Sequence, residues 1–208
     1  SVTPTSYSGY FDGTGDALLS AAASNNLVST DFTWEAWVNF SSLASSVCII
    51  ASGNSTNRTL FYYDSTNGLR YAVARSGVDQ VSIQQGSTTG WAVNTWYHVV
   101  IVRSGNNYTL YRNGVSIGTG TSSYSQSDLG TGLSVAYSEW ADSHLNLTGF
   151  ISNARVVNGT AVYTSAFTPP TSPLTAISGT KLLTCQSPTF IDNSTNNFTI
   201  TAFGNSQP

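Results

Sequence analysis

Short runs of alternating polarity, separated by turn-forming residues, dominate this sequence. The clearest run lies at 32–40, where every even position is apolar: Phe32, Trp34, Ala36, Val38 and Phe40. A period of two places these side chains on one face of a β-strand, with Glu35 and Trp37 on the other face. No segment shows a sustained apolar period of 3.6 residues, which an amphipathic helix requires. The chain is therefore predicted to be all-β.

Similar runs recur along the whole chain, at 7–11, 47–51, 59–63, 69–74, 81–84, 97–103, 108–112, 115–118, 133–137, 150–157, 182–184 and 198–202. Asn67-Gly68 and Asn113-Gly114 predict hairpin turns, because Asn and Gly tolerate positive φ. So many short strands are typical of a two-sheet sandwich. Neither a linker nor an internal repeat divides the chain, so a single domain is predicted over 1–208.

Charge content and the length of the apolar runs exclude two classes of partner. Charged residues make up 8% of the chain, the net charge is −3, and Lys181 is the only lysine. A chain without a basic stripe cannot neutralise phosphates, so nucleic-acid binding is not expected. No apolar run approaches the roughly 20 residues of a membrane-spanning helix, so membrane insertion is not expected either. The plentiful aromatic residues indicate a packed core instead of disorder.

The two cysteines, Cys48 and Cys185, both lie in apolar, strand-like runs. We favour two buried free thiols, with one disulfide as the alternative. Asn-x-Ser/Thr sequons begin at Asn39, Asn54, Asn57, Asn107, Asn146, Asn158, Asn193 and Asn197. Several fall inside predicted strands, where a glycan would block packing. This indicates a bacterial or viral chain instead of one secreted by an animal cell.

Four ordered segments, at 10–16 (YFDGTGD), 32–38 (FTWEAWV), 96–100 with 111–114 (WYHVV and YRNG) and 149–157 (GFISNARVV), carry a family resemblance. Together they resemble the laminin-G-like jelly roll of the concanavalin A-like lectin/glucanase superfamily. The resemblance implies two curved antiparallel sheets. Proteins of this superfamily bind carbohydrate, bind protein or act as spacers. The segments at 167–170, 182–186 and 198–200 are similar to a subgroup found in phage and marine bacterial surface proteins. Fold alone does not fix function.

Catalytic residues are not evident. Glycoside hydrolysis needs two carboxyl groups flanking the scissile bond, and the Glu-x-Asp-x-Glu pattern of the hydrolases with this fold is absent. Glu35 is interpreted as a hydrogen-bonded structural residue, and His98 as a histidine satisfied within the sheet. The chain is therefore predicted not to be an enzyme. A lyase or hydrolase with a displaced motif is the alternative.

The segment 137–144 is the main candidate for ligand binding, since it combines aromatic rings, which stack on sugar C–H faces, with acids that accept hydroxyl hydrogens. Trp140 is expected either to be exposed for stacking or to pack beneath the loop. Other aromatic candidates are Trp91, after a Gly-rich turn, and Tyr63, in a patch near the Asn67-Gly68 hairpin. The predicted ligand-binding residues are Tyr137, Glu139, Trp140, Asp142, His144, Trp91 and Tyr63.

Calcium is the cofactor that the resemblance suggests, because laminin-G-like relatives often hold one calcium ion at a sheet rim. Asp16 and Asn153 match the family positions by motif, although many relatives place Asp where this chain has Asn153. Glu139 and Asp142 are alternative ligands, since calcium prefers hard oxygen ligands.

We therefore predict a non-catalytic, lectin-like module that binds a cell-surface glycan. Its expected location is extracellular or on a virion surface, as part of a phage tail fibre or a bacterial adhesin. The alternative is a structural domain that decorates a virion or adhesin and contacts only protein, as a homo-oligomer such as a trimer.

Overall fold

The computed structural model describes residues 7–21, 31–140 and 143–208. In this part of the chain every regular element is a β-strand, and the strands form two large antiparallel sheets and one hairpin. No helix here is long and apolar enough to cross a membrane. The predicted all-β sandwich is confirmed.

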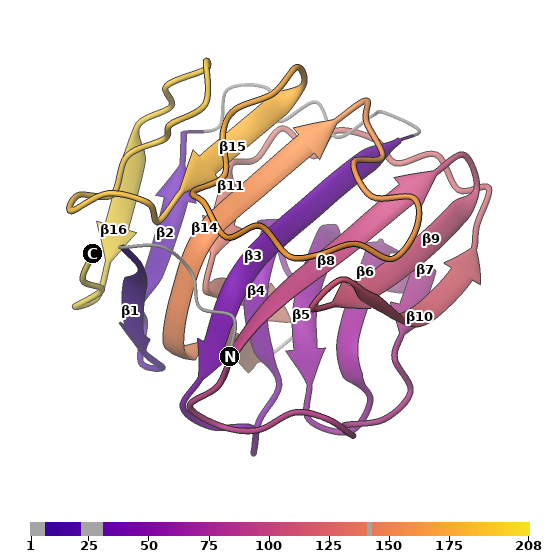
Figure 1. Ribbon diagram of the computed structural model, residues 1–208, viewed down its shortest axis with the longest axis horizontal. Helices are drawn as coiled ribbons and strands as arrows, with labels where there is room; N and C mark the ends of the chain where they lie inside the picture. The colour runs from indigo at the N-terminus through magenta and orange to yellow at the C-terminus, as the bar shows by residue number, and fades with distance from the viewer. Residues whose placement is uncertain (1–6, 22–30, 141–142) are drawn as a thin grey trace.

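Sheet A has the strand order β1 (Gly9–Asp12), β14 (Thr148–Asn158), β3 (Phe32–Phe40), β8 (Trp96–Ser104), β9 (Asn107–Arg112) and β10 (Val115–Thr121). The long strand β14 pairs with β1 through its first half and with β15 (Thr180–Thr184) through its second half. Sheet B has the order β16 (Ile200–Phe203), β2 (Ala17–Ser20), β11 (Leu133–Val135), β4 (Val47–Gly53), β5 (Arg58–Asp64), β6 (Gly68–Arg75) and β7 (Val78–Gln84). Figure 1 shows sheet A in front of sheet B.

The main core lies between the two sheets, and the alternation of β3 explains it. The even residues of β3 all belong to this core, together with Ile49, Phe61 and Tyr71 of sheet B. Trp34 meets Tyr71 edge to face, with ring centroids 6.0 Å apart. Burial of each large apolar side chain stabilises the fold by about 1.5–3 kcal/mol. The period-two pattern therefore fixes which face of β3 points inward.

The outer face of sheet A is covered by the segment 159–178, which follows β14 and crosses in front of β3 and β8 in Figure 1. Tyr163 and Phe167 of this segment pack against Val100, Val102 and Tyr111. The amide of Phe167 donates to the carbonyl oxygen of Gly114, at the turn after β9. This cover explains why residues on both faces of β3 are buried.

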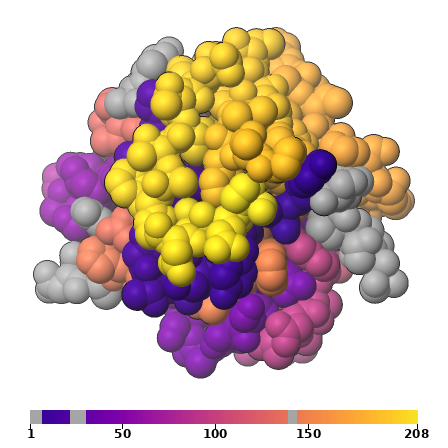
Figure 2. Space-filling view, turned by 90° about the vertical axis from the view of Figure 1, so that its left-hand side faces the viewer, coloured from indigo at the N-terminus to yellow at the C-terminus, as the bar shows by residue number. Residues whose placement is uncertain are grey.

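The two ends of the described chain lie together. Strand β16 pairs with β2 along its full length, and the backbones of Tyr10 and Gln207 exchange two hydrogen bonds. Figure 2 shows the C-terminal segment in yellow against the N-terminal strands in indigo. Sheet B is thus completed by strands from both ends of the sequence.

Both cysteines are buried and free, which confirms the favoured prediction. Cys185 belongs to the core between the sheets, whereas Cys48 faces the opposite side of sheet B. Because the two thiols lie on different faces of the fold, no disulfide joins them.

Candidate functional site

The segment 137–144, predicted to be a ligand-binding loop, begins a β-hairpin. Strand β12 (Tyr137–Trp140) pairs with β13 (Ser143–Asn146), so that Tyr137 lies opposite Asn146 and Ser138 opposite Leu145. Ala136 turns the chain out of β11 with a φ of 68°. The amide of Leu147 donates to the carbonyl oxygen of Ala136 and closes the base of the hairpin.

The hairpin is anchored on the outer face of sheet B by Leu145. This side chain packs in a second apolar cluster with Cys48, Ala51, Leu60, Tyr62 and Ala72. Strand pairing places Ala51, Leu60 and Ala72 in one row across β4, β5 and β6. The hairpin therefore covers the middle of the outer face and leaves the part formed by β16, β2 and β11 beside it.

A groove with a cavity volume of about 750 Å³ lies in that remaining part. We call it the hairpin groove. Its lining residues are Gly15, Ala17, Leu19, Gly53, Asn54, Gly130, Thr131, Gly132, Ser134, Tyr137, Ser138, His144, Asn146 and Phe203. The volume lies within the range of about 300–1,000 Å³ that is usual for small-molecule sites.

The floor of the hairpin groove is apolar. Phe203 lies opposite Ala17, and Leu19 lies opposite Ser134, so these side chains share the outer face of sheet B. Leu19 is 40% exposed and Phe203 is 46% exposed. Exposed apolar side chains of this size in a concave surface are typical of a binding site.

The rim of the groove carries hydroxyl and amide groups that their neighbours orient. Asn54 Oδ1 accepts the backbone N–H groups of Thr56 and Asn57, at 3.0 and 2.9 Å. The hydroxyl oxygens of Thr131 and Ser52 are 3.1 Å apart. Ser134 Oγ donates to the carbonyl oxygen of Tyr137 over 2.8 Å. These bonds fix the orientation of polar groups that line or adjoin the groove.

Two aromatic rings of the hairpin form one side of the groove. Tyr137 and His144 stack with centroids 5.4 Å apart and an interplanar angle of 27°. The Tyr137 hydroxyl lies 2.9 Å from His144 Nδ1, which fixes the two rings relative to each other. A fixed stack of this kind offers a pre-organised surface to a sugar ring.

The predicted ligand-binding residues have different outcomes. Tyr137 and His144 both line the groove. Both were predicted from the sequence as part of one ligand-binding segment. The backbones of Glu139 and Trp140 belong to β12. The side chains of Glu139 and Trp140, and all of Asp142, lie outside the described residues, so their roles stay predictions.

Two predicted residues lie outside the groove: the assignment of Tyr63 as ligand-facing is wrong, whereas a ligand contact of Trp91, which is only partly buried, stays a prediction. Tyr63 is 1% exposed, because it points into the core between the sheets. Trp91 is partly buried against this core, with its ring 5.5 Å from that of Tyr63. Trp91 Nε1 donates to Gln85, and the guanidinium of Arg112 covers the ring at 4.9 Å. The pair closes one end of the core.

The two positions proposed for calcium from the motif do not form a shared site. The carboxylate of Asp16 accepts the backbone N–H groups of Asp12 and Asn205, at 2.7 and 2.8 Å. Asn153 Oδ1 accepts from the Leu174 amide and from Gln186 Nε2. The strand register places these residues beyond opposite ends of β1.

Asp16 and Asn153 therefore do not fit a common calcium ion. Within the described residues, no three His, Cys, Asp or Glu side chains gather in a metal-binding arrangement. Calcium binding through Glu139 and Asp142 stays a prediction.

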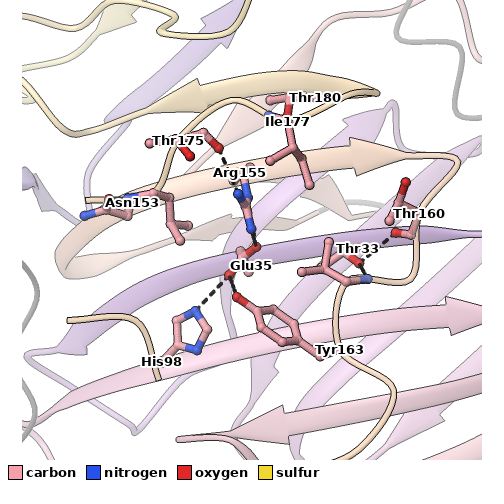
Figure 3. A network of polar contacts seen from close by, with 12 residues as sticks. Thr33, Glu35, His98, Asn153, Arg155, Thr160, Tyr163, Thr175, Ile177 and Thr180 are labelled. Atoms are coloured by element: carbon pink, nitrogen blue, oxygen red, sulfur yellow. Dashed lines mark hydrogen bonds and ion pairs between the residues drawn. The ribbon is translucent and has the colours of Figure 1, made fainter. Parts of the chain in front are cut away.

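Glu35 has the structural role that the sequence indicated, and Figure 3 shows its network. Arg155 donates to Glu35 Oε1 through Nε at 2.9 Å and Nη2 at 2.5 Å. Tyr163 Oη donates to Oε2 at 2.9 Å, and His98 Nε2 lies 3.0 Å from the same oxygen. Burial alone would raise the Glu35 pKa, but the hydrogen bonds and charges of His98 and Arg155 hold it below its ordinary value.

The apolar floor and much of the rim were not identified from the sequence. Leu18 and Leu19 are adjacent, and they point to opposite faces of a four-residue strand that was not predicted. Thr131 and Asn54 lie in polar turns that resemble many others in this Ser- and Thr-rich chain. Only the aromatic content of 137–144 marked the site.

The structure is a two-sheet jelly roll with a groove on the outer face of sheet B, and the comparisons with known proteins agree with that fold. A laminin G family model, described as the concanavalin A-like lectin/glucanases superfamily, matches residues 12–175. The chain belongs to this superfamily. No curated protein matches the sequence.

Several solved structures share the fold at low identity. A proposed carbohydrate-binding protein from Bacteroides ovatus has a TM-score of 0.66 and 15% identity over 97% of this chain, which spans 59% of that protein. Domain 4 of an extracellular arabinanase from Geobacillus stearothermophilus, in complex with arabinotriose, has a TM-score of 0.56 and 15% identity, covering 76% and 74% of the two chains. A sialidase carbohydrate-binding module from Ruminococcus gnavus, bound to α2,3-sialyllactose, has a TM-score of 0.56 and 12% identity over 71% and 86%.

Proposed function

We propose that this chain is a non-catalytic carbohydrate-binding module that binds an oligosaccharide in the hairpin groove. The observation that carries the proposal is the composition of this groove. An exposed apolar floor, a fixed Tyr137–His144 stack and a rim of hydroxyl and amide groups occur together in one concavity. Sugars present apolar C–H faces and many hydroxyl groups, and this combination suits both.

The proposal excludes catalysis in the hairpin groove for a chemical reason. Glycosidases canonically place two carboxyl groups on either side of the scissile bond. None of the described side chains that line the groove is a carboxylate. Glu35 is buried on the outer face of sheet A, beneath the segment 159–178, so it supports the fold. A binding role is therefore favoured over hydrolysis.

We place the module in an extracellular or virion-surface protein, such as a phage tail fibre or a bacterial adhesin. The low content of charged residues and the similarity of the segments at 167–170, 182–186 and 198–200 to phage and marine bacterial surface proteins support this location. A glycan on a cell surface is the expected partner.

A glycan array followed by isothermal titration calorimetry tests the proposal. The variant Tyr137→Ala should weaken binding by about tenfold or more, because an aromatic contact of about 1.4 kcal/mol corresponds to a factor of ten. Tyr7→Ala is the matched control, since Tyr7 is 45% exposed outside the groove. Titrations with and without calcium determine whether the ion contributes. If no glycan binds, the proposed function is wrong.

A second function, contact with protein, is favoured by an aromatic row on sheet A. Tyr10 pairs with Phe150, and Trp96 lies in the same row beyond Asn39 of β3. The ring centroids are 5.2 Å apart for Tyr10 and Phe150, and 6.3 Å apart for Phe150 and Trp96. Aromatic residues are enriched at protein interfaces. Light scattering would detect a trimer or another homo-oligomer, and Trp96→Ser should dissociate it. A monomer at all concentrations would contradict this second function.

A further inference from the structure

The hairpin groove is notable for the charges that it lacks. None of the described residues that line it is Asp, Glu, Lys or Arg, and its polar atoms belong to hydroxyl, amide, imidazole and backbone groups. We propose that the groove selects uncharged oligosaccharides over those that carry carboxylate or sulfate groups. This inference rests on the proposed function and deepens it by naming the class of ligand.

The cationic side chains of the chain lie outside the lining of the groove. All seven Lys and Arg side chains belong to described residues, and none of them lines the groove. The nearest by strand pairing is Arg58, opposite Gly53. Arg58 is 6% exposed and donates to the carbonyl oxygen of Ser55. A carboxylate in the groove would therefore find no cation within reach.

Four of the other five arginines have partners that do not line the groove, and Arg75 donates to the backbone carbonyl oxygens of Arg58 and Ser127. Arg70 pairs with Asp64 at 3.2 Å, and Arg155 pairs with Glu35 in the network of Figure 3. Arg103 donates to two backbone carbonyl oxygens, and Arg112 covers Trp91. Moving any of them into the groove would break these contacts. Placing one of these arginine side chains in the groove would therefore lower the stability of the fold.

The described residues beside the groove offer an anion no compensation. Asp16 lies between the lining residues Gly15 and Ala17, and its buried carboxylate accepts the backbone N–H groups of Asp12 and Asn205. An anionic sugar would lose hydration on entry and would find no positively charged side chain among the described residues that line the groove. Burial of an unpaired carboxylate is strongly unfavourable, whereas a hydroxyl group needs only one hydrogen-bond partner.

The groups that are present suit hydroxyl ligands. Asn146 Oδ1 is buried at the edge of the groove and accepts no hydrogen bond from the described residues. A sugar hydroxyl would supply the donor that this oxygen lacks. Ser134 Oγ uses its proton on the Tyr137 carbonyl oxygen, so its remaining capacity is to accept a hydrogen bond. A carboxylate cannot donate to either oxygen.

Matched pairs of glycans test the inference by calorimetry on the whole chain. Lactose is compared with 3′-sialyllactose, and oligogalactose with oligogalacturonate of the same length. We expect the neutral member to bind at least about tenfold more tightly, with an affinity that changes little between low and high salt. If acidic members bind equally or more tightly through the groove, the inference fails while the proposed function stands. If nothing binds, both fail.

A gain-of-charge variant gives an independent readout. Thr131→Lys adds a cation at the rim, and Thr131→Gln is a neutral control of comparable length. The lysine variant should improve the affinity for the acidic glycans about fivefold relative to the glutamine variant, and the improvement should disappear at high salt. Equal affinities of the two variants for acidic glycans would overturn the inference, because the groove would then already neutralise anions by another route.

Discussion

Replacing Glu35 by Gln tests whether the buried ion network holds the segment 159–178 against the outer face of sheet A. The carboxylate is fully buried and is contacted from three elements, since Arg155 lies on β14, His98 on β8 and Tyr163 in the segment 159–178. Glutamine has nearly the same shape, but it removes the negative charge. Arg155 is 5% exposed, so its positive charge would remain buried without a counter-ion.

The expected loss of stability follows from that unpaired charge. Removing one partner of a buried ion pair costs about 3–5 kcal/mol of unfolding free energy. Glutamine can still accept from Tyr163, so we expect a loss near the lower end, about 3 kcal/mol. At about 2–4 °C per kcal/mol for a domain of this size, the melting temperature should fall by roughly 6–12 °C.

Urea unfolding at pH 7, followed by tryptophan fluorescence, measures this loss. Asp64→Asn is the matched control, since it removes the charge from an ion pair in which both side chains are 16% exposed. The control should lose no more than about 1 kcal/mol. If Glu35→Gln lowers the free energy of unfolding as little as Asp64→Asn does, the network does not stabilise the fold as we argue. The segment 159–178 would then be held by its apolar contacts alone.

Three further predictions concern pH, the thiols and the hairpin. The pKa of Glu35 is lower in the folded chain than its ordinary value of 4.5. The ionised carboxylate therefore contributes to the free energy of unfolding above pH 4.5, and this contribution is lost as the pH falls through the pKa of the folded chain. Acid titrations should show a shallower loss of stability in Glu35→Gln than in the natural chain. Burial raises the pKa of Cys185 to about 12 and that of Cys48 further, so a thiol reagent at pH 8 should label neither cysteine until urea unfolds the chain, and rapid labelling of the native protein would contradict their burial. Leu145→Ala should cost about 2–4 kcal/mol and weaken glycan binding, because Leu145 anchors the hairpin; Ile191→Ala, at a position 44% exposed, should cost under about 0.5 kcal/mol in the same urea assay.

The fold was predictable from the sequence because local signals and the tertiary structure agree. The even residues of β3 face the core as the alternation predicts, and both Asn-Gly pairs occupy turns, where Asn113, Gly68 and Gly114 adopt positive φ. The short strand β2 was missed. Its two leucines face opposite sides, and its outward side lines a groove, so the segment shows no clean alternation.

The candidate site was only partly predictable, because a groove depends on which surfaces remain uncovered. Tyr62 and Tyr63 are adjacent and point to opposite faces, yet both are buried, since the core covers one and the hairpin cluster the other. Trp91 follows a Gly-containing turn, but the chain folds back onto Phe40 and Tyr97. Sequence composition identified the hairpin aromatic residues, whereas the floor required the pairing of β16 with β2.

That pairing has a consequence for how the chain would respond to the glycan that we propose it binds. The floor joins Leu19 from the start of the chain to Phe203 from its end, and the hairpin wall comes from a third region. A bound glycan would therefore act as a clamp across three distant segments, and it would favour the folded state by the free energy of its binding. Occupancy of the groove should then be measurable without a labelled sugar, as a rise in melting temperature and as slower proteolysis of the strand that contains Phe203.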